Sequence, residues 1–137
     1  MPIPGVHDAI IYLMVIISAA DRDMTDDELA RIGQVARTWP VFQDFDLERL
    51  IPAAQACQKL LQQEEGLDGV LALTSRIIPQ RLRDTAYAAV VDVAAADMEI
   101  GLEERRVIQK LRQSLALDAA KAESIEFAAK ARCRTLT

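Results

Sequence analysis

Two short segments of the 137-residue chain, residues 19–28 and 95–104, gather carboxylates in the same pattern. Each begins with Ala-Ala-Asp, continues after one intervening residue with an acid and then Met or Ile, and places a Glu four residues after the Met or Ile. The carboxylates at these positions are Asp21, Asp23, Glu28, Asp97, Glu99 and Glu104. Because hard cations prefer oxygen ligands, Ca²⁺, Mg²⁺ or Mn²⁺ is the cofactor that such sets would bind.

Each acidic segment follows a long apolar run and precedes a second helical pattern, so we expect a helix, a corner and another helix. Asp21 and Asp97 then stand at the C-terminal end of a helix, where the negative end of the macrodipole disfavours a carboxylate. The same local violation occurs twice at corresponding places. Violations of this kind tend to mark functional positions.

The same residues also have a purely structural interpretation. Thr25 and Glu28 match the Ser/Thr-x-x-Glu capping box, which begins a helix without any metal, and the corner aspartates could serve as caps. The first segment resembles the start of an EF-hand loop. However, Asp26 stands where that loop needs Gly, and Ile32 stands where it needs Glu. Metal binding and simple helix capping therefore both remain open interpretations.

The rest of the chain shows helical periodicity, which predicts an all-α fold of about seven helices. The first, over residues 6–20, is apolar nearly all round, which is typical of a helix at the centre of a domain. Thr25 is expected to begin the second, which ends before Pro40. The remaining helices are expected over residues 47–64, 67–78, 80–96, 102–115 and 119–132.

Residues that commonly begin or end helices support these boundaries. Asp46 and Asp118 are suitable N-caps for the third and the last helix. Gly66 is expected to take the left-handed conformation that ends the third helix. The aromatic residues between the second and third helices are expected to plug one end of the core, and they are Trp39, Phe42 and Phe45.

Apolar residues at helical spacing predict which side chains are buried. In the third helix the stripe includes Ile51 and Cys57, and in the last helix it includes Phe127, with Cys133 just beyond. Both cysteines are expected to be inert core residues. His7, the sole histidine, is expected to cap a helix or to lie exposed at the surface.

The two acidic segments are 76 residues apart, and apolar positions match at the same offset, as Ile32 matches Ile108. The simplest explanation is an internal duplication. We therefore predict a single domain in which two similar three-helix halves, residues 6–64 and 80–132, pack around a central helix pair. Helix 67–78 joins the halves.

Composition excludes several classes of function. The net charge is −5, with 16 basic and 21 acidic residues, and no run of Lys or Arg occurs, so we expect no binding to nucleic acid. The apolar run Ala9–Ala20 is too short to span a bilayer, so we expect no membrane insertion. Two cysteines without a CxxC motif fit a reducing cytoplasm.

No motif for catalysis is evident. No Ser or Cys has the sequence context of an activated nucleophile, there is no glycine-rich phosphate loop, and a single histidine makes no ordinary zinc site. We therefore expect a protein that is not an enzyme and that works by binding, with a protein partner.

The paired corners resemble those of the TerB-like family, which comprises the tellurite-resistance protein TerB and its relatives. The resemblance extends from about residue 6 to residue 131. In the first copy it rests on Ala20–Asp21, Met24 and Glu28, and the matching residues of the second copy are Ala96–Asp97, Ile100 and Glu104. The family usually has Gly after the Asp, where this chain has Arg22 and Met98.

The resemblance implies an all-α fold, a role in the response to tellurite or other chemical stress, and a divalent metal at the acidic corners. Two functional hypotheses follow. The first is a cytoplasmic stress-response module that binds a cation at both corners. The second is a protein–protein adaptor whose acidic residues only cap helices.

Overall fold

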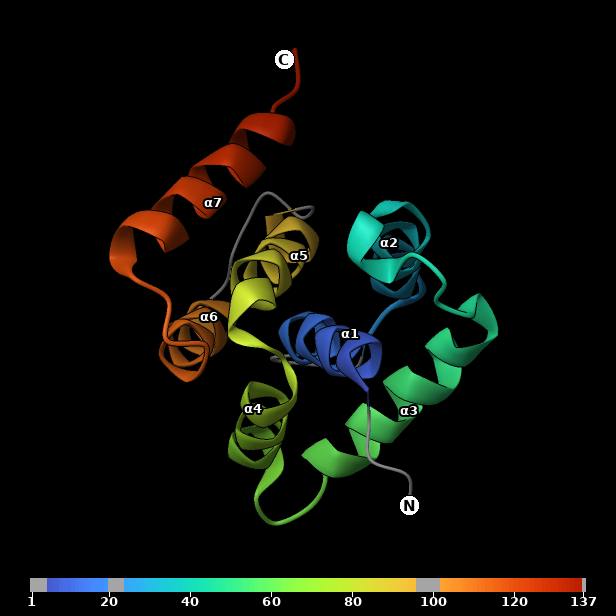
Figure 1. Cartoon of the computed structure of the whole chain (residues 1–137). Helices are drawn as coiled ribbons and strands as arrows, with labels where there is room; N and C mark the ends of the chain where they lie inside the picture. The colour runs from blue at the N-terminus through green and yellow to red at the C-terminus, as the bar shows by residue number, and fades with distance from the viewer. Residues whose placement is uncertain (1–4, 20–23, 96–101, 137) are drawn as a thin grey trace.

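The computed structural model describes residues 5–19, 24–95 and 102–136, and throughout these ranges the regular structure is helical (Figure 1). Three 3₁₀ turns occur, over Pro40–Phe42, Leu47–Arg49 and Gln80–Leu82. The α-helices of the described chain are α1 (Val6–Ser18), α2 (Asp26–Thr38), α3 (Leu50–Leu61), α4 (Gly66–Ile77), α5 (Arg83–Ala95), α6 (Leu102–Ser114) and α7 (Ala119–Arg132). The predicted all-α single domain is confirmed.

Helix α1 lies in the middle of the fold, as its composition predicted. Figure 1 shows it surrounded by α2, α3, α4, α5 and α6, all of which contact it. Every residue from Asp8 to Ser18 is buried. None of the helices in the described ranges combines the length and the apolar composition needed to cross a bilayer.

The second central helix is α5, which packs against α1 and α7. The two central helices have corresponding neighbours. Helix α1 packs on α3, and α5 likewise packs on α7. Each central helix also contacts the second helix of the other half, which is α6 for α1 and α2 for α5. Helix α4 packs on α1 and α3, and the described chain contains no counterpart of it on α5. Superposition of the two halves as three-helix units stays a prediction.

Side-chain caps begin α2, α7 and the 3₁₀ turn before α3. Thr25 Oγ1 accepts a hydrogen bond from the backbone N–H of Glu28 at 3.2 Å, and the backbone N–H of Thr25 donates to Glu28 Oε1 at 2.9 Å. This reciprocal pair is the predicted capping box at the start of α2. Asp118 accepts from the backbone N–H of Lys121 at 2.8 Å and is confirmed as the cap of α7. Asp46 accepts from the backbone N–H of Glu48 at 3.0 Å, but it caps the 3₁₀ turn Leu47–Arg49 that precedes α3 and not α3 itself.

Replacing Thr25 with Ala is expected to lower the free energy of unfolding by about 0.5–2 kcal/mol, the usual loss for an N-cap hydroxyl. Urea denaturation followed by circular dichroism measures the change. Thr25→Ser keeps the hydroxyl and serves as the control, with little change expected. A Thr25→Ala protein as stable as the parent would show that the capping box contributes nothing.

Four residues predicted to be buried are not. Leu47, which begins the predicted stripe of the third helix, is 44% exposed. Ile51 is 54% exposed, Phe127 is 67% exposed, and Cys133 is partly exposed, whereas Cys57 is fully buried as predicted. The reason is that α3 and α7 are outer helices. Each rests on a central helix through one stripe only, so an apolar residue beside that stripe has nothing to cover it.

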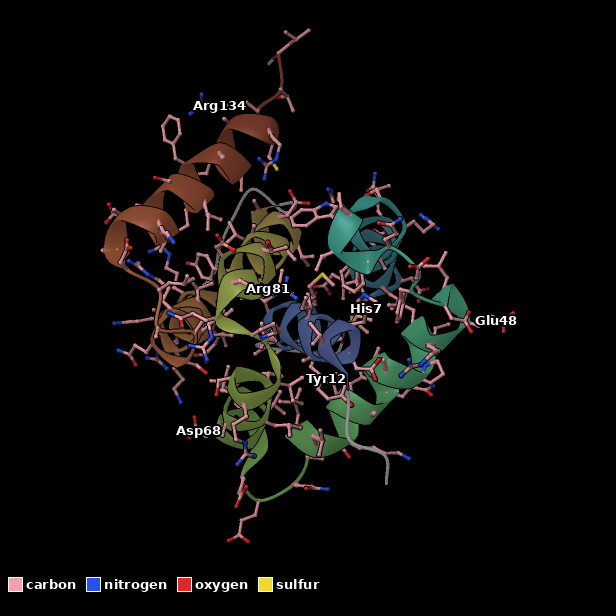
Figure 2. The ribbon with its side chains drawn as sticks, in the orientation of Figure 1. His7, Tyr12, Glu48, Asp68, Arg81 and Arg134 are labelled. Carbon is pink, nitrogen blue, oxygen red and sulfur yellow. The ribbon has the colours of Figure 1, made fainter. Side chains whose placement is uncertain are left out.

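The prediction for His7 was also wrong. Its ring is half-buried and lies 5.3 Å, centroid to centroid, from both Phe42 and Phe45. Its Nε2 atom lies 2.8 Å from the carbonyl oxygen of Val41. His7 therefore belongs to the aromatic plug predicted for the segment between α2 and α3, and it links this segment to the start of α1 (Figure 2).

Gly66 takes the left-handed conformation predicted for it, with φ of 49°. Its position differs from the prediction, because α3 already ends at Leu61 and Gly66 is the first residue of α4. A Cβ atom there would lie 3.3 Å from the carbonyl oxygen of Leu61. The glycine therefore permits the close reversal between α3 and α4.

Two acidic corners and a groove as candidate sites

The acidic corners lie where the central helices end. The first lies between α1, which ends at Ser18, and α2, which begins at Asp26. The second lies between α5, which ends at Ala95, and α6, which begins at Leu102. Four of the six predicted metal ligands lie outside the described residues, and they are Asp21, Asp23, Asp97 and Glu99.

The two described candidates, Glu28 and Glu104, stand in the first turns of α2 and α6. Glu28 Oε1 accepts from both the backbone N–H and the hydroxyl of Thr25, at 2.9 and 3.0 Å. Within the described ranges no three His, Cys, Asp or Glu side chains come together as a metal site. Capping by Glu28 is thus confirmed, and a ligand role for the six carboxylates stays a prediction.

The C-terminal ends of α1 and α5 differ electrostatically from those of the other described helices. Neither has a basic residue in its last turn. The remaining α-helices each have at least one there, and these residues are Arg37, Lys59, Arg76, Arg112, Lys130 and Arg132. A cation at a helix C-terminus offsets the partial negative charge of the terminal carbonyl groups. Both acidic segments therefore follow helix ends that lack this compensation.

Ser18, at the end of α1, is a candidate ligand that sequence reasoning missed. The residue is 6% exposed, and its Oγ atom is buried with no hydrogen-bond partner among the described residues. An unsatisfied buried hydroxyl is costly, and a hard cation would supply a partner for its oxygen. The sequence signal for this ligand was that Ser18 is the one polar residue toward the end of an apolar run. The corresponding residue of the second corner, 76 residues later, is Ala94, which has no side-chain oxygen.

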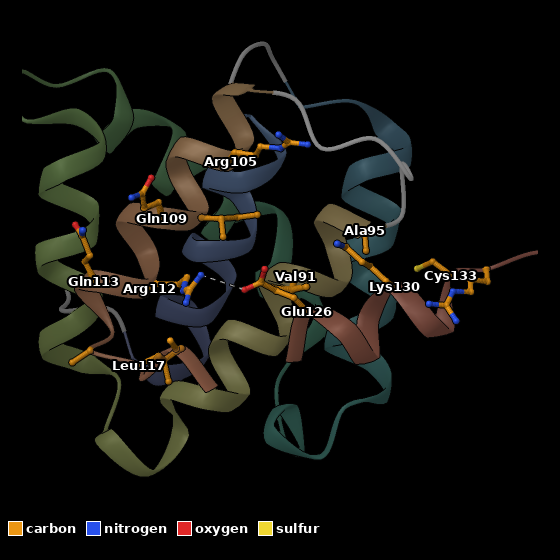
Figure 3. A pocket seen from close by; sticks show the side chains of 14 residues that line it. Val91, Ala95, Arg105, Gln109, Arg112, Gln113, Leu117, Glu126, Lys130 and Cys133 are labelled. Carbon is orange, nitrogen blue, oxygen red and sulfur yellow. Dashed lines mark ion pairs between the residues drawn. The ribbon is translucent and has the colours of Figure 1, made fainter. Parts of the chain in front are cut away.

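A groove of about 1060 Å³ lies between α6 and α7, over α5 (Figure 3). Apolar side chains from three elements line it, and they are Val91, Ala95, Ile108 and Leu117. Basic side chains also line it, and they are Arg105, Arg112, Lys130 and Arg134. These cations do not form a run in the sequence, because they come from α6, from α7 and from the residues just after α7, which only the fold brings together.

One acid in the groove is held by its neighbours. The hydroxyl of Tyr87 donates to Glu126 Oε2 at 2.9 Å, and Arg112 Nη1 lies 3.8 Å from the same oxygen. Burial raises the pKa of the Tyr87 hydroxyl, and the hydrogen bond to Glu126 adds to the effect. Tyr87 is therefore a proton donor to Glu126 at neutral pH, and this pair fixes α7 to α5.

Residues 7–127 match the family model described as tellurite resistance protein TerB. The chain belongs to the TerB family. No curated protein and no solved structure matches it. The TerB match extends from the first turn of α1 into α7, so both acidic corners and most of the groove lie within the TerB domain.

Proposed function

We propose that this TerB domain is a non-catalytic, cytoplasmic stress-response module that binds a divalent cation, Ca²⁺, Mg²⁺ or Mn²⁺, at its two acidic corners. The observation that carries the proposal is the absence of a basic residue from the last turns of α1 and α5, in contrast to the other described helices. The family description connects the domain with tellurite resistance, which is the stress that we include in the proposal.

The residues proposed to hold the cation at the first corner are Asp21, Asp23 and Glu28, with Ser18 as a further oxygen donor. At the second corner they are Asp97, Glu99 and Glu104. All of these supply oxygen, which suits a hard cation. A bound cation would supply the positive charge that the end of the central helix lacks. The carboxylates would in turn join that helix end to the start of the next helix.

The first test is thermal unfolding with and without cation. A ligand that binds only the folded chain stabilises it by about 2.7 kcal/mol at a hundred times its dissociation constant. For a domain of this size each kcal/mol raises Tm by roughly 2–4 °C. We expect millimolar Ca²⁺, Mg²⁺ or Mn²⁺ to raise Tm beyond the effect of NaCl at equal ionic strength. The Asp21→Asn, Asp97→Asn double variant should lose this rise.

A charge-matched control separates a specific site from screening of the acidic chain. Glu48→Gln combined with Glu123→Gln removes the same two negative charges from exposed positions in other elements. This control should keep the cation response of the parent. If all three cations stabilise the parent no more than NaCl does, or if both double variants respond like the parent, the proposed cation sites are wrong.

A second candidate function is a protein–protein adaptor whose acidic residues cap helices. It is favoured by the Thr25–Glu28 capping box and by the groove between α6 and α7. A requirement for a cation in folding or in partner binding distinguishes the two functions. If the protein is an adaptor, EDTA should change neither its folding nor its binding to a partner.

A further inference from the structure

At two positions that line the groove, the second half of the chain differs from the first half. In the first half, α2 lies so close to Leu50 that a Cβ atom added to Gly33 would be 3.4 Å from Leu50 Cδ2. The residues at the 76-residue offset are Gln109 and Glu126, and both line the groove. Where the first half has a glycine packed near a leucine, the second half thus has two longer polar side chains that line the groove.

The segments that connect the second and third helices of each half also differ in length. Residues 39–49 join α2 to α3 and carry the aromatic plug, whereas only residues 115–118 join α6 to α7. This short connection turns tightly at Ala116, where φ is 53°, and the N–H of Leu117 bonds to the carbonyl of Arg112 at 3.1 Å. Figure 3 shows α6 and α7 running in different directions from this turn, and the groove lies between them.

The charge of the groove is opposite to that of the chain. Arg105 on α6, Lys130 on α7 and Arg134 just after α7 are all exposed and line its walls. No acid in the described ranges forms an ion pair with Arg105 or Lys130, whereas Arg112 already faces Glu126. A chain with net charge −5 thus presents an apolar floor between positively charged walls.

We propose that this groove binds an acidic amphipathic helix of a partner protein. The groove follows α6 from Arg105 to Gln113, a rise of about 12 Å, which is roughly two turns of a docked helix. Apolar residues at i, i+3 and i+4 would cover the floor, and flanking Asp or Glu would meet the walls.

Phe127 is not one of the residues that line the groove, but it contacts Arg134, which does line the groove. Phe127 is 67% exposed, and the guanidinium of Arg134 lies 5.9 Å from its ring centroid. Exposed aromatic and arginine side chains at the edge of an apolar groove are typical of protein interfaces. This inference does not depend on whether either corner binds a cation.

The test uses a fluorescein-labelled peptide of about 15 residues, long enough to form a helix on binding, with Leu at helical spacing and Glu on its other faces. Fluorescence anisotropy measures its dissociation constant with the full chain. We expect saturable binding that weakens as salt is raised. A peptide with Lys in place of every Glu should not bind. All titrations are done both in EDTA and in Mn²⁺, so that failure of the cation sites does not affect the result.

Two charge-reversal variants locate the peptide. Arg105→Glu with Lys130→Glu should weaken binding by at least about tenfold, because like charges then face the peptide. Arg76→Glu with Arg81→Glu makes the same change in net charge at exposed positions on α4 and the following 3₁₀ turn, and should change the dissociation constant little. Circular dichroism and urea denaturation should show both variants folded, because all four side chains are exposed.

Several results would overturn the proposal. Equal losses in the two variants would mean that net charge alone attracts the peptide. Tighter binding of an oligothymidylate or of the Lys peptide than of the Glu peptide would assign the groove to another class of ligand. A dimer in sedimentation that dissociates in the Arg105→Glu, Lys130→Glu variant would show that a second copy of this chain occupies the groove.

Discussion

Replacing Leu13 with Ala is expected to lower the free energy of unfolding by about 2–5 kcal/mol, the range for a fully buried leucine. Leu13 lies in α1, has no exposed surface, and is surrounded by the helices that pack around the centre of the fold. The loss combines the lost transfer of apolar groups from water with the cavity that remains. Because domains are stable by only about 5–15 kcal/mol, urea denaturation should show a much lower midpoint.

The matched control is Leu102→Ala, which removes the same atoms from a leucine that is 64% exposed in α6. A surface substitution of this kind should change stability by only about 0.5 kcal/mol. Losses of similar size in the two variants would contradict a fold centred on α1. A Leu13→Ala loss below about 1 kcal/mol would contradict it as well.

Raising the pH is expected to destabilise the protein strongly above about pH 9. Burial raises the pKa of the Cys57 thiol from 9.0 to about 12. The stabilising effect of the buried neutral thiol is complete below the unfolded pKa and is lost as the pH rises toward the folded pKa. One pKa unit corresponds to about 1.4 kcal/mol, so this thiol alone should cost roughly 2–3 kcal/mol by about pH 11.

Two buried tyrosines should also make the folded chain less stable as the pH rises. Burial also raises the pKa values of Tyr12 and Tyr87 above 10.0, so neither ionises readily in the folded chain. Urea denaturation at a series of pH values measures the slope. Cys57→Ala should flatten the slope, and Cys133→Ala, in which a partly exposed thiol is removed, should not. Identical slopes in both variants would contradict the assignment of this effect to Cys57.

The central helices could be predicted because their signals are local. Helix α1 is apolar on nearly every face, and this composition alone places it in the middle of a domain. The caps of Thr25 and Asp118 were predicted for the same reason, since each acts on a backbone group three residues away.

The outer surfaces could not be predicted, because they depend on which helices have neighbours. Ile16 in α1 is buried, while Asp92, 76 residues later in α5, is partly exposed and pairs with Arg132 at 3.4 Å. Helix α4 packs on α1, and no corresponding helix covers α5 within the described residues. The groove was not predicted for a related reason, because the residues that line it come from α5, α6, α7 and the segments beside α7, which only the fold brings together.

Of the candidate corner residues, sequence patterns identified the carboxylates but not the hydroxyl. The repeated acidic pattern is visible in the sequence, whereas the burial of Ser18 Oγ and its lack of a partner appear only once α1 is packed. The contrast between the last turns of α1 and α5 and those of the other helices likewise required the observed helix boundaries.

The central claim is that both corners bind a divalent cation, and counting bound Mn²⁺ tests it most directly. Electron paramagnetic resonance detects free aqueous Mn²⁺, so titration into the full chain gives the number of bound ions. We predict two ions per chain, a weakened first site in Ser18→Ala, and no saturable binding in the Asp21→Asn, Asp97→Asn variant. Equal Mn²⁺ binding by the parent and by that double variant, or none by either, would contradict the claim.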